Sequence, residues 1–249
     1  RHSAITLADR INENVANGEE WDVVFCSDML NLAEWKGLIH PSVSTLPTVL
    51  YFHENQLTYP SQQPRDWDYH FAFSNFTSAI AADFIWYNSR FNEDEFLREL
   101  NEFLKRMPDF VPVAHIPLLR EKSSIQPPGV DTVFARGKDT ASGNHTDALI
   151  VTWAARWEHD KNPETFFDAV RIAINNGVNL RLRVLGESFK NQPDVFEQAR
   201  VEFATFIDQF GYADSKSSYL DFLRSSDVFV STAIHEFFGI TAVEASLAG

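Results

Sequence analysis

Short apolar runs alternate with amphipathic segments along the chain, a pattern typical of β–α units built around parallel sheets. In the first half, apolar runs at residues 21–26, 48–52 and 84–87 predict strands. Residues 91–106 predict a helix, because their apolar positions recur at the helical period on one face. Asn92 followed by Glu95 resembles a capping box at the start of this helix.

The second half repeats the alternation. Apolar runs at residues 149–154, 180–185 and 228–232 predict strands, and residues 219–225 and 240–248 predict helices. A further helix is expected to begin at Asn162 and Pro163, because Asn is a good N-cap and Pro suits the first helical position. Gly177 is expected to end that helix.

A polar stretch at residues 136–147 is the best linker candidate. It divides the chain into an N-terminal domain, residues 1–135, and a C-terminal domain, residues 148–249. Each is predicted to be a Rossmann-like α/β domain with a parallel sheet. Ligands of such sheets bind beyond the carboxyl ends of the strands, so we expect the two sheets to face each other across a ligand-binding cleft.

Composition narrows the class of protein. The net charge is −14 and both halves are acidic, so neither half has the balance of a generic nucleic-acid binder, although a local basic patch stays open. Cys26 is the only cysteine and lies in an apolar run, which predicts a buried strand thiol and favours a reducing, cytoplasmic compartment.

The sequence predicts no membrane span, because no stretch reaches the roughly 18 apolar residues that a span requires. No signal peptide is visible. The chain opens at Arg1 without Met and ends at Gly249 within a helical pattern, so we expect segments to be missing at both termini.

The clearest chemical motif lies between the strand and the helix predicted on either side of residues 235–239. Glu236 lies in the turn, Gly239 lets the backbone approach a ligand closely, and Ile240 begins a helix whose free N–H groups would face an anion. Glu244 lies about two helical turns further on, so both carboxylates can face the same cleft, and carboxylates are good acceptors for sugar hydroxyls. A surface Glu and an unrelated helical Glu are the plainer interpretation of the spacing alone.

A second motif supplies positive charge. Arg156 follows the strand predicted at residues 149–154, and Lys161 precedes the helix that begins at Pro163. Two cations beside free helix N–H groups suit a diphosphate, and two solvated loop charges are the plainer alternative. Gly186, after the strand at residues 180–185, is a weaker candidate for a ligand contact at a strand end, because glycine is common at such positions.

Polar residues also follow the strands of the first half. His53 comes after the strand at residues 48–52, where it is a candidate donor to a substrate oxygen or partner of a sugar hydroxyl. A histidine at such a position is more often structural. Asn88 and Ser89 follow the strand at residues 84–87 and are expected either to contact ligand or to cap the next helix.

Other chemistries find little support in the sequence. It contains no Cys/His set with metal-ligand spacing, no Walker sequence, no Gly-x-Gly-x-x-Gly and no serine nucleophile elbow. Asp66 and Asp68 fall in a loop rich in proline and aromatic residues rather than after a strand, so they do not predict a metal site. We therefore expect no metal and no cofactor.

Residues 231–245 resemble the Glu-x7-Glu signature of the retaining, GT-B-fold glycosyltransferases of family four, including the Phe-Gly after the first Glu and the Glu-Ala at the second. The resemblance covers residues 149–249 and implies a nucleotide-sugar donor. It implies that Arg156 and Lys161 neutralise the donor pyrophosphate.

The same resemblance implies roles for the remaining candidates. Glu236 would orient the donor sugar, Glu244 would bind the ribose, and His53 would face the donor sugar. Gly186 would lie near the nucleotide. Neither a protein nucleophile nor a metal is implied.

Segments of the first half resemble a narrower family. They are Phe-Cys-Ser-Asp-Met-Leu-Asn-Leu at residues 25–32, Leu-Tyr-Phe-His-Glu-Asn-Gln-Leu-Thr-Tyr-Pro at residues 50–60 and Ala-Asp-Phe-Ile-Trp-Tyr-Asn-Ser-Arg-Phe-Asn at residues 82–92. Over residues 21–131 the chain resembles the tRNA-queuosine alpha-mannosyltransferases. This resemblance implies GDP-mannose as donor and the queuosine of an aspartate tRNA as acceptor.

Two alternatives stay open. One is a family-four glycosyltransferase that acts on a lipid or polysaccharide acceptor. An exposed, basic amphipathic helix would favour a membrane-surface acceptor, and the sequence contains none. The other is a non-catalytic module that binds a sugar nucleotide.

Overall fold

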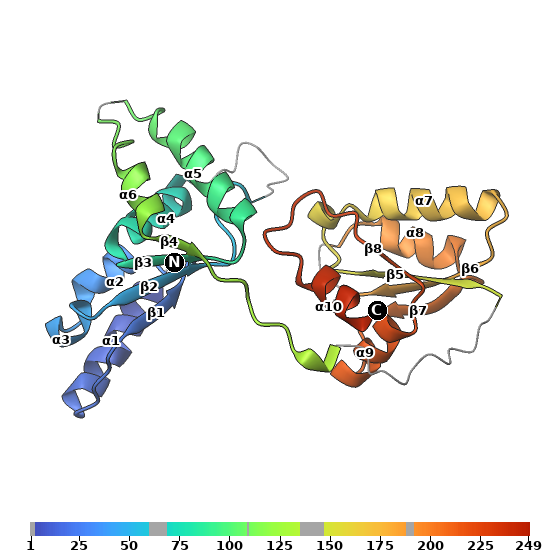
Figure 1. The fold of residues 1–249 in the computed structure, drawn as a ribbon, viewed down its shortest axis with the longest axis horizontal. Helices are drawn as coiled ribbons and strands as arrows, with labels where there is room; N and C mark the ends of the chain where they lie inside the picture. The colour runs from blue at the N-terminus through green and yellow to red at the C-terminus, as the bar shows by residue number, and fades with distance from the viewer. Residues whose placement is uncertain (1–2, 60–68, 109, 135–146, 188–191) are drawn as a thin grey trace. The chain divides into compact units, whose positions relative to one another are not determined.

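The chain forms two compact units, Arg1–Pro128 and Gly129–Gly249. A computed structural model describes residues 3–59, 69–108, 110–134, 147–187 and 192–249 (Figure 1). Each unit has its own sheet and its own core, as the alternating pattern of the sequence predicts.

The first unit is built on a four-stranded parallel sheet in the order β1-β2-β3-β4. The strands are β1 (Val24–Ser27), β2 (Thr48–Phe52), β3 (Phe84–Tyr87) and β4 (Ser123–Ile125). The helices are α1 (Ser3–Ala16), α2 (Leu32–Leu38), α3 (Pro41–Ser44), α4 (Tyr69–Ala81), α5 (Arg90–Leu104) and α6 (His115–Glu121).

Side-chain alternation decides which face of this sheet is buried. Leu50 and Ile85 are fully buried, and they pack into the core that the helices form. Their neighbours along the strands, Tyr51 and Trp86, point to the opposite face, where Phe25 contacts both rings at centroid distances of 6.0 and 5.8 Å. Phe25 is 60% exposed, so within the described chain this aromatic face is open to solvent.

The second unit has a parallel sheet in the order β7-β6-β5-β8. Its strands are β5 (Leu149–Ala154), β6 (Leu180–Leu185), β7 (Ile207–Gly211) and β8 (Val228–Val230). Its helices are α7 (Pro163–Asn175), α8 (Val195–Glu202), α9 (Lys216–Arg224) and α10 (Ile240–Ala248), with short 3-10 turns η1 (Thr132–Phe134) and η2 (His159–Lys161).

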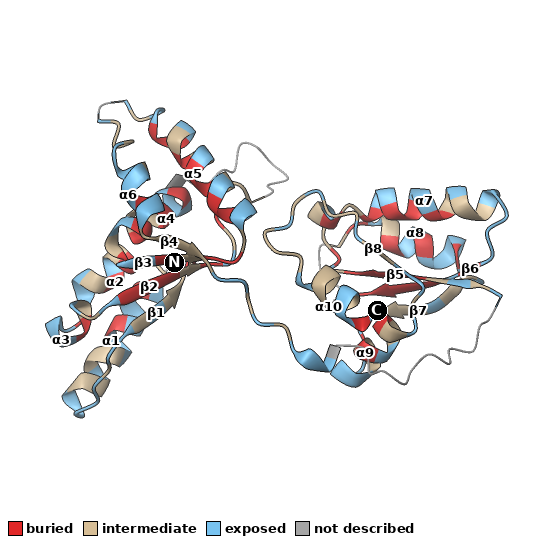
Figure 2. Ribbon diagram, viewed as in Figure 1, coloured by how far each residue is buried: buried red, intermediate tan, exposed pale blue. Residues whose placement is uncertain are grey.

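Helices cover both faces of this second sheet (Figure 1). On one face, α7 and α8 pack against an aromatic core that includes Trp153, Phe166 and Phe196. On the other face, α9 and α10 form a smaller cluster around Leu220 and Ala248. Figure 2 shows the buried residues of α7 and α8 on the sides that face the sheet. The predicted α/β class with parallel sheets is therefore confirmed.

The strand order of the second unit contains a topological switch. The chain runs from β5 to β6 and β7 on one side, and then returns to place β8 on the other side of β5. The loops that leave β5 and β8 therefore diverge at their carboxyl ends. Open α/β sheets bind ligands at such a point.

Most predicted elements occur at the expected residues, and the differences are local. The strand predicted at residues 228–232 ends at Val230, since Thr232 bonds instead to the β5–α7 loop. The helix predicted at residues 219–225 begins earlier, at Lys216, because Ser215 caps it by accepting from the N–H of Ser218 at 3.0 Å. Burial raises the pKa of the Cys26 thiol to about 12, in keeping with a structural strand residue.

The capping box predicted at Asn92 and Glu95 is wrong. Helix α5 begins at Arg90, and Ser89 is its N-cap, with the Oγ accepting from the N–H of Asn92 at 3.0 Å. Asn92 is fully buried and its side-chain amide bonds to other partners. A serine just before the apolar period was the stronger capping signal.

The first unit ends at Pro128, before the domain end predicted at residue 135. Residues 131–133 belong to the second unit and contact its helix α9, because Lys216 pairs with Asp131 at 2.7 Å and Arg224 donates to the carbonyl of Val133 at 2.7 Å. The linker predicted at residues 136–147 lies outside the described residues except for Asp147, and the loop with Asp66 and Asp68 lies outside them too.

Arg183 fixes β6 to its surroundings. It is 8% exposed although it carries a charge, and its Nε donates to Asp208 Oδ2 at 2.6 Å. Its Nη1 donates to the carbonyl of Phe222 at 2.9 Å and to Ser225 Oγ at 2.7 Å. Arg181, two residues earlier on the same strand, is exposed and donates to the carbonyl of Thr205.

This difference predicts unequal effects of the same substitution. Arg183→Met leaves Asp208 without its cation, and the carbonyl of Phe222 and Ser225 Oγ without this donor, so we expect the free energy of unfolding to fall by about 2 kcal/mol. Arg181→Met is the matched control on the same strand and should change it by less than about 0.5 kcal/mol. Urea unfolding followed by circular dichroism measures both. Equal losses in the two variants would contradict the assigned role of Arg183.

Candidate functional site

A pocket of about 660 Å³ lies at the carboxyl ends of β5 and β6, within the second unit. Residues from the strand ends, from α9 and from α10 line it: Ala154, Ala155, Arg156, Leu185, Gly186, Glu187, Tyr212, Ala213, Asp214, Ser215, Lys216, Tyr219, Thr241 and Glu244. The volume lies within the range of small-molecule sites.

Three residues singled out from the sequence line this pocket: Arg156, Gly186 and Glu244. The Arg156 side chain is half exposed and pairs with Glu158 at 3.3 Å. Glu244 accepts a hydrogen bond from the Tyr219 hydroxyl at 2.9 Å, which fixes one carboxylate oxygen. Burial and the adjacent charge of Glu244 raise the pKa of Tyr219, so this hydroxyl remains a donor.

Lys161 and Glu236 contact each other outside the lining of the pocket. The Lys161 Nζ lies 2.8 Å from Glu236 Oε1 and 3.0 Å from Asp160 Oδ2, and the Lys161 side chain is 10% exposed. Burial lowers the pKa of Lys161, but the hydrogen bonds and charges of Glu236 and Asp160 outweigh it, so the net pKa is raised. Lys161 is therefore a buried cation held by two carboxylates.

Backbone and hydroxyl contacts hold the β8 loop against the β5–α7 loop. The N–H of Ile234 donates to the carbonyl of Asp160 at 2.9 Å. Thr232 Oγ1 donates to the carbonyl of Lys161 at 2.9 Å and accepts from Trp153 Nε1 at 3.1 Å. The two motifs found in the sequence are thus joined at the switch point of the sheet.

The start of α10 depends on glycine for its backbone conformation. Gly239 is the N-cap with φ 78° and ψ 52°, a left-handed conformation that other residues rarely adopt. A Cβ at Gly239 would meet nothing within 4 Å, so it is conformation rather than crowding that requires glycine. Ile240 follows as the first helical residue and is 44% exposed. The N–H of Ala242 donates to the carbonyl of Gly239 at 3.1 Å, and helix geometry directs the N–H groups of Ile240 and Thr241 out of the helix end, where an anion could accept from them.

Gly186 is required by close packing. A Cβ there would lie 1.9 Å from the carbonyl oxygen of Ala155 and 2.7 Å from the ring of Trp157. The backbone of β6 therefore approaches the loop after β5 as closely as the chain permits. This glycine shapes the pocket wall beside Arg156.

Several lining residues were not recognised in the sequence, notably Lys216, Tyr219 and Thr241. A signal for them was present. Lys216 and Tyr219 are three residues apart on α9, and Thr241 and Glu244 are three residues apart on α10, so each pair shares one helix face. Without the helix packing, however, nothing indicated that these faces meet.

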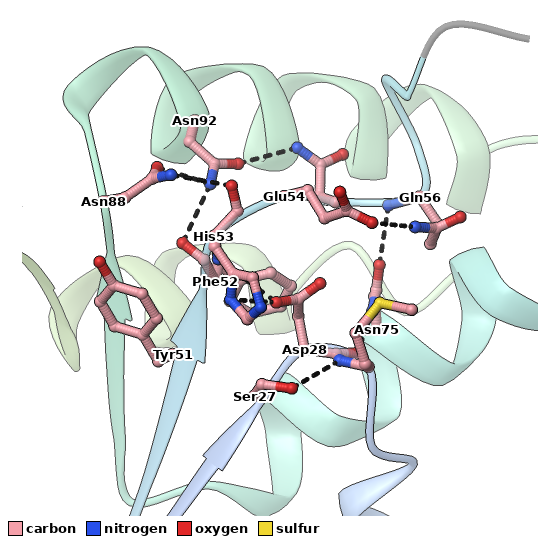
Figure 3. Close-up of polar contacts among 12 residues, drawn as sticks. Ser27, Asp28, Tyr51, Phe52, His53, Glu54, Gln56, Asn75, Asn88 and Asn92 are labelled. Atoms are coloured by element: carbon pink, nitrogen blue, oxygen red, sulfur yellow. Dashed lines mark hydrogen bonds and ion pairs between the residues drawn. The ribbon is translucent and has the colours of Figure 1, made fainter. Parts of the chain in front are cut away.

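His53 lies in the first unit, where a carboxylate holds its ring (Figure 3). Its Nδ1 lies 2.9 Å from Asp28 Oδ1, and its backbone N–H donates to the same oxygen at 3.3 Å. The side-chain hydrogen bond with Asp28 is the largest cause of a raised pKa for His53, which burial opposes. No local pattern indicated that Asp28 pairs with His53, because the two residues follow different strands.

Buried asparagines hold the backbone at this strand end (Figure 3). Asn88 Nδ2 donates to the carbonyl of His53 at 2.8 Å, and Asn92 Nδ2 donates to the carbonyl of Phe52 at 3.1 Å. Asn55 Nδ2 donates to Asn92 Oδ1 at 2.9 Å. Asn88 is thus a buried brace of the His53 backbone, and Ser89 is a helix cap.

Within the residues that the structure describes, no three His, Cys, Asp or Glu side chains are grouped so as to hold a metal ion. In the same residues, no helix combines the length and apolar character needed to cross a bilayer.

Comparison with protein families gives two matches that together cover most of the chain. Residues 1–130 match the family described as tRNA-queuosine alpha-mannosyltransferase N-terminal. Residues 136–249 match glycosyl transferases group 1. A similar curated protein is the tRNA-queuosine alpha-mannosyltransferase of Drosophila melanogaster, which is 33% identical over 256 residues covering 100% of this chain and 66% of the relative.

Solved structures share the fold at low sequence identity. HepE of Anabaena in complex with UDP aligns with a TM-score of 0.68 and 13% identity, over 98% of this chain and 61% of HepE. Starch synthase IV of Arabidopsis thaliana, bound to ADP and acarbose, aligns with a TM-score of 0.61 and 13% identity, over 93% of this chain and 56% of its own. The chain thus spans less than two thirds of the length of these relatives. Each of the two α/β units is built on a parallel sheet, and together with this architecture the likenesses confirm the GT-B fold class.

The close approach at Gly186 yields a testable prediction. Gly186→Ala places a methyl group against the Ala155 carbonyl, so we expect the free energy of unfolding to fall by roughly 2 kcal/mol or more. Gly129→Ala, where the added Cβ meets nothing within 4 Å, is the control and should remain within about 0.5 kcal/mol of the parent. Thermal unfolding of both proteins measures the difference. A Gly186→Ala protein as stable as the control would show that the loop after β5 yields freely.

Proposed function

The chain belongs to the tRNA-queuosine alpha-mannosyltransferase family, and from this membership we propose that it is a retaining glycosyltransferase that transfers mannose from GDP-mannose to the queuosine of an aspartate tRNA. Two matches support this proposal: residues 1–130 match the N-terminal model of that family, and residues 136–249 match glycosyl transferases group 1. The activity of the Drosophila relative, as its name gives it, supports the acceptor. A tRNA acceptor would locate the reaction in the cytoplasm.

The observation that carries the proposal is the pocket at the carboxyl ends of β5 and β6 in the second unit. It combines the half-exposed cation Arg156 with the carboxylate of Glu244 and with the first turn of α10, whose Thr241 lines the pocket. Arg156 and the helix N-terminus suit the pyrophosphate of a nucleotide sugar, because both attract anions. Glu244, with one oxygen bonded to Tyr219, retains acceptor sites for a ribose diol.

The ion pair between Lys161 and Glu236 holds a positive charge that can stabilise the leaving diphosphate. In the proposed donor complex, Glu236 turns to the hydroxyls of the donor sugar, and Lys161 then directs its charge to the diphosphate. As the bond from the anomeric carbon to the phosphate oxygen breaks, negative charge grows on that oxygen, and Lys161 and Arg156 stabilise it. The acceptor hydroxyl attacks from the same face and its proton passes to the departing phosphate oxygen. No protein nucleophile is assigned.

Removing either cation should slow transfer without unfolding the protein. We expect Arg156→Gln and Lys161→Met each to lower kcat by about 100-fold or more, because each removes a charge that stabilises the leaving group. Arg171→Gln is the matched control, since Arg171 pairs with Glu202 and Asp168 on the surface away from the pocket lining. Steady-state transfer assays measure the effect, and near-parental kcat in the first two variants would exclude their role.

Donor and acceptor can be tested with the intact protein. We expect radiolabelled mannose to move from GDP-mannose to aspartate tRNA that contains queuosine, and not to the same tRNA with guanine at that position. UDP-glucose as donor and a lipid extract as acceptor are the matched comparisons. Transfer from UDP-glucose would refute the donor assignment, and transfer to lipid alone would refute the acceptor assignment. Binding of nucleotide sugar without any transfer would indicate a non-catalytic module.

A further inference from the structure

Asp28 is a buried charge with an unusual set of partners. Its side chain is 0% exposed, and Oδ1 receives both the Nδ1 contact and the backbone N–H of His53. Asp28 Oδ2 is also buried, and it receives no hydrogen bond from the residues that the structure describes. A carboxylate buried with one oxygen unsatisfied is costly, and an asparagine would accept the backbone N–H at lower cost. Its charge therefore has a use beyond holding the backbone.

The imidazole of His53 is held so that one nitrogen remains available. Because Nδ1 faces a carboxylate oxygen at 2.9 Å, the proton lies on Nδ1 in the neutral ring. The Tyr51 ring stacks on it at a centroid distance of 5.8 Å, and Asn88 holds its carbonyl at 2.8 Å. The side chain is nevertheless 49% exposed, so Nε2 is the nitrogen left to meet a substrate.

The charged groups around the ring all favour its protonated form. Asp28 faces it from the end of β1, and Glu54 adds a second negative charge from the loop after β2. Tyr51, which stacks on the ring, carries no charge, because burial raises the pKa of its hydroxyl above the ordinary value for tyrosine. Partial burial of the ring is the one opposing effect.

We propose that Asp28 is a positioning residue that fixes the orientation and tautomer of His53, so that the imidazolium donates a hydrogen bond from Nε2 to a substrate oxygen. The substrate contact rests on the proposed glycosyltransferase function, whereas the Asp28–His53 relation rests on geometry alone. In the Ser-His-Asp triad of hydrolases, a buried carboxylate likewise orients a histidine without taking its proton.

The first test is an NMR titration of the His53 ring in the full chain, assigned by its disappearance in His53→Gln. In the parent protein we expect the His53 pKa above 6.5 and the neutral ring protonated on Nδ1. In Asp28→Asn the pKa should fall, because the negative charge is lost while the amide oxygen can still accept from Nδ1 and from the backbone N–H. In Asp28→Ala the pKa should also fall, and the neutral ring should shift to the Nε2-protonated tautomer, because Nδ1 then has no acceptor. An unchanged pKa and tautomer would overturn the role of Asp28, whatever the activity.

Glu54→Gln is the matched control for this titration. It removes a carboxylate near the same ring but leaves the contact at Nδ1. We expect a small fall in the His53 pKa and no change of tautomer. A change of tautomer equal to that of Asp28→Ala would mean that net charge, and not Asp28, determines the tautomer of the ring.

The second test measures transfer against pH. We expect Asp28→Asn to lower kcat/KM by about 100-fold and to move the alkaline limb of the profile to lower pH by the shift seen in the titration. Asp28→Glu keeps the charge, so its limb should stay near that of the parent even where the rate falls. If Asp28→Asn does not fold, a displaced limb in Asp28→Glu refutes the proposal.

A double-substitution cycle separates positioning from a general structural effect. If Asp28 acts only through His53, then Asp28→Asn should change kcat/KM less than twofold in a protein that already carries His53→Gln. Fully additive losses would overturn the proposal. A parent protein that titrates as expected but transfers no sugar would refute the proposed function and the substrate contact of His53, while leaving the assignment of Asp28 intact.

Discussion

The parallel pairing of β5 with β6 on one side and β8 on the other is the constraint on which the second unit depends. Because all these strands point the same way, the loops after them meet at one edge of the sheet. Arg156, Gly186 and Glu236 come from three such loops that are far apart in sequence. The buried aromatic core under α7 and the hydrogen bond from Thr232 to the carbonyl of Lys161 hold those loops in place. The pocket is therefore a consequence of strand order.

The buried cation Lys161 near the proposed donor site is paired with carboxylates of the protein itself. The whole chain carries a net charge of −14, so an isolated cation near the pocket would be surrounded by acidic groups. Lys161 is buried between Asp160 and Glu236, and this pairing keeps it protonated in spite of its burial. An ion pair of this kind contributes little net stability but holds two functional groups at a fixed separation of 2.8 Å. A ligand that satisfies Glu236 and Lys161 separately would exchange one set of charge contacts for another.

In the first unit, buried polar groups at the end of β2 are likewise paired with one another. Asn55, Asn88 and Asn92 satisfy one another and the backbone, which leaves the strand end rigid. Against this frame, Asp28 is a buried group that is only half satisfied, and its partner His53 is half exposed. The paired amides thus form the frame of the strand end, and the incompletely paired Asp28 carboxylate is the group proposed to position His53.

The sequence by itself determined the α/β class, most strand positions and the two charged motifs, because apolar periodicity and strand-end chemistry are local properties. It also indicated Glu244, Arg156 and Gly186, which line the pocket. It did not determine that Ser89 caps α5 or that residues 131–133 belong to the second unit, because these depend on competing local hydrogen bonds and on contacts with α9. Only the tertiary structure paired Lys161 with Glu236 and Asp28 with His53, and only it brought Tyr219 to Glu244. These pairs join residues from different β–α units, and their separation in space depends on strand order and helix packing, which no local pattern encodes.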